Sequence, residues 1–133
     1  MTGEIMAYYN SKIVNHSFDE AILKVTDELK KEGFGILTEI DVKETFKKKL
    51  DIDFRRYRIL GACNPPNAYK ALQAEENIGV LLPCNVVVQE KADGKIQVSA
   101  VNPMESMQSV GNENLAEVAI DVSGRLKKVI DAL

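Results

Sequence analysis

One stretch of the chain constrains its fold more than any other: the run from Ile78 to Glu90 and the segment that follows it. The run is apolar and rich in β-branched residues, and Ala92-Asp93-Gly94 after it is typical of a hairpin turn. The segment from Lys95 to Val101 then alternates between apolar and polar side chains, which favours a strand with one buried face. These features predict two strands paired antiparallel, the first of which needs cover on both faces.

Two long amphipathic helices are predicted, one before this hairpin in the chain and one after it. Ser17 and Glu20 form a capping box ahead of apolar residues at helical spacing, and Gly33 supplies a left-handed residue that ends the first helix. Between Leu115 and Leu133, apolar residues recur at steps of three and four. This stripe predicts a C-terminal helix with a narrow core face.

The remaining elements complete the predicted order. They are a strand ending near Val14, strands over 34–42 and 56–63, a short helix from an Asp41 cap to about Leu50, and a helix from Asn64 to about Glu75. The polar segment 108–114 is expected to be a mobile loop, and Asn102-Pro103 a chain turn. The order predicts an α+β fold: one mostly antiparallel sheet with the two long helices on one face, in a single domain spanning residues 1–133.

Composition narrows the classes of protein that this chain can belong to. It has 133 residues, 28% of them charged, and a net charge of -3, so a nucleic-acid partner is not expected. No run approaches about 18 apolar residues and the N-terminus lacks the features of a signal peptide, so we expect a cytoplasmic protein without a membrane partner. Basic residues gather in 43–58, where they either form a solvated face or attract an anionic ligand.

Proline and asparagine interrupt two of the predicted strands, and each interruption lies beside a cysteine. Pro-Cys-Asn at 83–85 stands inside the apolar run, although proline cannot donate to a sheet and asparagine is depleted in strands. Cys-Asn-Pro at 63–65 ends the strand over 56–63. If the two strands are neighbours, four side chains would line one pocket with two soft sulfurs and two amides. They are Cys63, Asn64, Cys84 and Asn85.

The alternative interpretation of these four residues is structural. Both cysteines would then be small core residues, Asn64 would cap a helix, and Asn85 would satisfy a broken ladder. Glu39 and Asp41 are further candidates for binding, because two carboxylates two apart on a strand share a face. They too have a structural alternative, in which Asp41 is a helix cap and Glu39 a solvated neighbour.

The sequence identifies no cofactor and predicts no metal site. The two cysteines match no zinc or redox spacing, so free thiols are expected, and a zinc site completed by His16, the single histidine, lacks every usual spacing. Three functions remain open: a small-molecule binding module, a homodimeric scaffold without catalysis, and a thiol-dependent redox or sulfur-transfer protein. For thiol chemistry Cys63 is the better candidate, because it precedes a helix whose first amides could stabilise a thiolate.

Several separated motifs resemble the domain of unknown function 302 family. They are Gly33-Phe34-Gly35, Thr38-Glu39-Ile40-Asp41, the segment 58–65, the segment 78–88 and Asn102-Pro103. The resemblance implies a TATA-box-binding-protein-like arrangement, with an antiparallel sheet and two helices packed on one side. It implies no activity, and likeness to a DNA-binding fold does not imply DNA binding. Its characteristic positions in this chain are Glu39, Asp41, Cys63, Asn64, Pro65, Pro83, Cys84 and Asn85.

Overall fold

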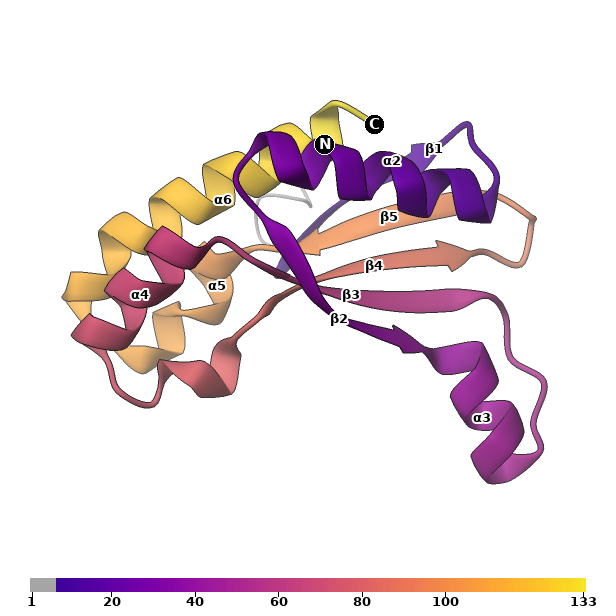
Figure 1. Ribbon diagram of the computed structural model, residues 1–133, viewed down its shortest axis with the longest axis horizontal. Coiled ribbons are helices and arrows are strands. Elements are labelled where there is room, and N and C mark those ends of the chain that lie inside the picture. The colour runs from indigo at the N-terminus through magenta and orange to yellow at the C-terminus, as the bar shows by residue number, and fades with distance from the viewer. Residues whose placement is uncertain (1–6) are drawn as a thin grey trace.

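A computed structural model describes residues 7–133, and its core is a five-stranded antiparallel sheet in the order β1-β5-β4-β3-β2 (Figure 1). The strands are β1 (Tyr9–Val14), β2 (Gly35–Asp41), β3 (Tyr57–Cys63), β4 (Cys84–Glu90) and β5 (Ile96–Val101). The helices are α2 (Phe18–Lys31), α3 (Val42–Leu50), α4 (Pro65–Ala74), α5 (Pro103–Ser106) and α6 (Ala116–Asp131). The α+β class, the antiparallel sheet and the two long helices on one face are confirmed.

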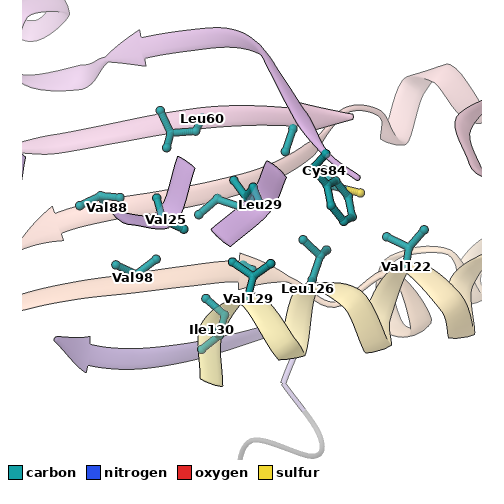
Figure 2. Close-up of a cluster of buried hydrophobic side chains, with 14 of the residues drawn as sticks. Val25, Leu29, Leu60, Cys84, Val88, Val98, Val122, Leu126, Val129 and Ile130 are labelled. Carbon is teal, nitrogen blue, oxygen red and sulfur yellow. The ribbon is translucent and has the colours of Figure 1, made fainter. Parts of the chain in front are cut away.

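The two long helices, α2 and α6, lie side by side on one face of the sheet (Figure 1). The capping box predicted for α2 is present, since the Ser17 side chain accepts from the Glu20 amide and the Glu20 carboxylate accepts from the Ser17 amide. Between these helices and the sheet lies a core of aliphatic side chains (Figure 2). Its labelled members are Val25, Leu29, Leu60, Cys84, Val88, Val98, Val122, Leu126, Val129 and Ile130.

Two elements depart from the prediction. The long strand predicted from Ile78 is wrong in its first part: residues Ile78–Leu81 form the 3-10 helix η1, and the sheet pairing of β4 begins only at Cys84. Pro83 lacks an amide donor, so the ladder starts after it. The turn predicted at Asn102-Pro103 instead begins the short helix α5, where the Asn102 side chain accepts from the Met104 amide.

The segment predicted as a mobile loop, residues 108–114, contains regular structure. Gln108–Val110 and Glu113–Leu115 form the 3-10 helices η2 and η3, and Gly111 between them has a φ of 72°. A positive φ is readily adopted by glycine, so this residue lets the chain turn toward α6. Leu115 enters the core at 2% exposure, which fixes this connection against the rest of the molecule.

The outlying helix is α3, which projects beyond the sheet and away from α2, α4 and α6 (Figure 1). None of its residues is buried. The predicted Asp41 cap is present, since the Asp41 carboxylate accepts from the Glu44 amide at 2.9 Å. An edge-to-face pair of Phe46 and Phe54 holds the helix against the chain that leads into β3.

Candidate ligand-binding cavity

A cavity of about 330 Å³ lies where the ends of β3 and β4 meet α4, η1 and α6. Its walls are formed mainly by apolar side chains. Three of the four predicted cysteine and asparagine positions line it: Cys63 and Asn64 at the end of β3, and Cys84 at the start of β4. The residues that line the cavity include Cys63, Asn64, Asn67, Leu72, Cys84 and Met107. Pockets of this size and apolar character bind small molecules in many proteins.

Cys63 and Cys84 come to this cavity from neighbouring strands. Cys84 is the first residue of β4 and pairs with Ala62 of β3, so Cys63 is one position beyond the residue opposite Cys84, and both cysteines line the cavity. Both are free thiols; Cys84 is buried and Cys63 partly exposed. Burial, with a smaller contribution from nearby Cys63, raises the pKa of the Cys84 thiol to about 11. Cys84 is therefore a neutral thiol at pH 7.

Asn64 lines the cavity but its side chain is already bonded to protein. Its Oδ1 atom accepts from the Asn67 amide at 3.2 Å, which caps α4, and its Nδ2 atom donates to the carbonyls of Glu32 and Gly33, each at 3.3 Å. Gly33 has a φ of 84°, and a Cβ atom there would meet Asn64 Nδ2 at 2.9 Å. Asn64 therefore caps α4, as the structural alternative predicts, and it also lines the cavity.

The same asparagine belongs to a closed ring of hydrogen bonds that joins α2, α4 and α6. Asn67 Nδ2 donates to Asn64 Oδ1 at 3.1 Å and to Asp121 Oδ2 at 2.8 Å. Arg125 Nε donates to the same Asp121 oxygen at 3.0 Å. Arg125 Nη1 donates to the Glu32 carbonyl at 3.1 Å, which closes the ring. Hydrogen bonding by Asn67 and Arg125 lowers the pKa of the Asp121 carboxyl. The ring holds the helices that enclose one side of the cavity.

Asn85 does not join the cavity, which corrects the predicted four-residue pocket. Successive side chains of a strand point to opposite faces. Cys84 faces the helices, so Asn85 lies on the other face of the sheet, where it lines a second hollow of about 360 Å³ with Val87 and Gln89. Three of the four predicted residues are brought together, and the fourth is excluded by the alternation of the strand.

Glu39 and Asp41 share a face of β2, as their spacing predicts, but both are paired with Arg58 of β3. Arg58 Nη1 bonds the Glu39 carboxylate, and Arg58 Nη2 lies 3.4 Å from Asp41 Oδ2. Asp41 also caps α3. These carboxylates do not line the cavity, and their interactions fit the structural alternative.

The basic segment 43–58 comprises most of α3 and the chain that leads into β3. Several of its basic side chains form ion pairs with nearby carboxylates. Lys47 lies 2.9 Å from Asp51, Lys48 lies 3.5 Å from Glu44, and Arg56 lies 3.8 Å from Glu90. Exposed pairs of this kind contribute little to stability. They match the interpretation of this segment as a solvated face.

Asn67, Leu72 and Met107 line the cavity but were not predicted from the sequence. Asn67 carries a usable signal, because it stands three residues after the Asn64 cap, where a side chain can join the capping interaction. Met107 carries none, since no element was predicted for it between the turn at Asn102-Pro103 and the loop 108–114, and it lines the cavity where α5 ends. Among residues 7–133, no group of three or more His, Cys, Asp or Glu side chains is placed to hold a metal ion.

The fold is that of a two-layer α+β protein with a partly open apolar cavity, and comparison with known proteins gives its family. The chain belongs to the family described as domain of unknown function DUF302, which it matches over residues 10–133. It is similar to a solved structure described as an uncharacterized conserved DUF302 protein from Bacillus stearothermophilus. That similarity has 30% sequence identity and a TM-score of 0.87, covering 93% of this chain and 96% of the other. No curated protein matches the chain.

In the part of the chain that the structure describes, no helix is long and apolar enough to cross a membrane.

Proposed function

We propose that this protein is a small-molecule binding module and that its site is the cavity lined by Cys63, Asn64 and Cys84. The observation that carries the proposal is the size and character of this cavity: about 330 Å³, with apolar walls. It falls within the range of about 300 to 1,000 Å³ that is typical of ligand pockets. We treat residues 1–133 as one domain and place the protein in the cytoplasm, where its free thiols stay reduced.

The chemistry of the walls favours a compact, apolar ligand. The Asn64 amide is already bonded on both its oxygen and its nitrogen, so it offers a ligand little. The Cys84 thiol is neutral and buried. Affinity would therefore come from burial of apolar surface, with the two sulfurs as polarisable contacts.

The chain contains no tryptophan, which allows a site-specific test. Leu72→Trp places the only tryptophan at the cavity, where Leu72 is 45% exposed. Titration with the neutral apolar dye N-phenyl-1-naphthylamine should give saturable energy transfer from this tryptophan to the dye. The matched control is Leu23→Trp, on an α2 side chain that is 72% exposed and does not line the cavity. Equal transfer from both positions, or none from Leu72→Trp, would count against the site.

A thiol-dependent function is a second candidate, favoured by the meeting of Cys63 and Cys84 at one cavity. Cys63 is the group that would react, because it is partly exposed and directly precedes the cap of α4. Iodoacetamide labelling tests this: fast labelling of Cys63 supports the candidate, and labelling of both thiols only in denaturant removes it.

We also propose a homodimer, the scaffold that the apolar run in β4 predicts. Val87 supports it, because this side chain lies on the face of β4 opposite the helices and is only half-buried. Sedimentation of the protein over a range of concentrations tests this proposal independently of any ligand.

A further inference from the structure

The face of the sheet opposite α2 and α6 is formed by uncharged strand side chains. The registers of the five strands place one set of side chains on this face, which we call the open face. Apart from Gly35 and Cys63, which have the same register at the end of the sheet near the cavity, its members are Tyr9, Ser11, Ile13, Thr38, Ile40, Tyr57, Ile59, Gly61, Asn85, Val87, Gln89, Gln97, Ser99 and Val101. Among these described strand residues, none carries a formal charge, although 28% of the chain is charged.

All of these side chains except the buried Gly61 are at least partly exposed. Ile13 is 47% exposed and Ile40 is 48% exposed. The centre of the face is formed by Ile59 of β3 and Val87 of β4, which are directly opposite each other. A sheet face that only meets water would carry mainly polar and charged side chains. Depletion of charge with retained aliphatic and tyrosine side chains is the composition of an interface core.

We propose that a second copy of this chain docks on the open face, so that the two sheets pack face to face. This inference rests on the homodimer proposed above and specifies its surface; it is independent of the ligand proposed for the cavity. A face with charges of one sign would require a partner of the opposite sign. Amide and hydroxyl side chains such as Gln97 and Ser99 are both donors and acceptors, so this face is complementary to itself.

The size of the open face agrees with a dimer of modest affinity. Five strands about 4.8 Å apart and about 20 Å long give a footprint of about 500 Å². Two such faces remove about 1,000 Å² from water, which is near the lower limit of about 1,000 Å² for a specific interface. At one rim Arg55 donates to Gln89 at 3.1 Å and its guanidinium lies 4.5 Å from the centre of the Phe54 ring. This charge lies at the edge, as charges at interfaces usually do.

Sedimentation velocity of the unmodified chain and of three variants tests the proposal. Val87→Lys places a charge at the centre of the open face, and should raise the dimer Kd by at least about 30-fold, the effect of losing a central interface contact. Ser99→Lys should act in the same direction. Ser99 is opposite Val87 in the register and already partly exposed, so this variant leaves the core unchanged. Leu23→Lys, on the outer side of α2, is the matched control and should leave the Kd unchanged.

The outcomes separate the surface from the dimer itself. A higher dimer Kd for Ser99→Lys and Val87→Lys, with an unchanged Kd for Leu23→Lys, supports the open face as the dimer surface. If the unmodified chain dimerises and both open-face variants dimerise equally well, the dimer stands and this surface is wrong. If the unmodified chain remains a monomer up to about 100 µM, both the dimer and its surface are wrong, while the ligand proposed for the cavity is unaffected.

Discussion

The two faces of the sheet are built from the same strands and differ in what covers them. On the face under α2 and α6, side chains such as Leu60, Val86 and Val98 are buried and apolar. On the open face, Ile59 and Val87 lie side by side between Ile40 and Ser99, and both stay partly exposed. The comparison shows that one strand can serve the core with one set of side chains and a contact surface with the other.

The largest effect is expected from removing a side chain of α6 from the core between this helix and the covered face of the sheet. Leu126→Ala should destabilise the protein by about 3 to 5 kcal/mol, because Leu126 is fully buried and its loss leaves a cavity. On the open face Ile13→Ala should cost less than about 1 kcal/mol at protein concentrations where the chain is a monomer, because Ile13 is 47% exposed there. Urea unfolding measures both. A large cost for Ile13→Ala that grows with protein concentration would show that this face is buried by a second copy.

The second prediction compares the two thiols at the cavity. With a pKa of about 11, Cys84 is ionised to about one part in 10⁴ at pH 7. Its alkylation should therefore be at least about 100-fold slower than that of an unhindered cysteine, whose pKa is about 8.5. Cys63, which is partly exposed, should react first. Mass spectrometry of the two tryptic peptides over time gives both rates, with Cys63→Ser as the control that removes the faster one. Equal rates would contradict the burial of Cys84.

The third prediction compares two helix caps, one buried at the cavity and one exposed. Asn64→Ala should cost about 2 to 3 kcal/mol, because it removes a cap and leaves buried polar groups without a partner. Asp41→Ala removes the cap of the projecting helix α3 and should cost about 1 kcal/mol. Urea unfolding curves decide the order. Equal costs would mean that water replaces the partners of Asn64, so that the hydrogen-bonded ring contributes no more than an exposed cap.

The smallest effect is the pH dependence of the stability that Asp121 contributes through the ring of hydrogen bonds between α2, α4 and α6. The pKa of Asp121 is lower in the folded protein than its ordinary value, so its contribution to stability is present above that value and is lost as the pH falls through the folded pKa. We expect the stability difference between the unmodified protein and Asp121→Asn to be constant near neutral pH and to shrink below about pH 4. Urea midpoints from pH 7 to pH 3 measure it. A difference that stays constant to pH 3 would show that Asn67 and Arg125 do not bond the charged carboxylate.

The starts of α2, α3 and α4 were predicted correctly because each depends on residues that are close together in the chain. The capping box of α2 and the caps by Asp41 and Asn64 depend on bonds between residues three apart, so the sequence displays them directly. The start of β4 was misplaced, because an apolar run does not distinguish a buried strand from the 3-10 helix η1. Pro83 marks the boundary, although the sequence suggested an interruption within one continuous strand.

The sequence by itself determined the antiparallel α+β class, the helix caps and the place of the two cysteines beside a boundary of regular structure. The tertiary structure alone decided that Cys84 faces the helices and Asn85 the open face, because only the core chooses between the two orientations of a strand. It also decided that Met107 and Leu72 complete the cavity with Cys63. Met107 is far from Cys63 and Leu72 in the chain, so it meets them only when the helices pack on the sheet.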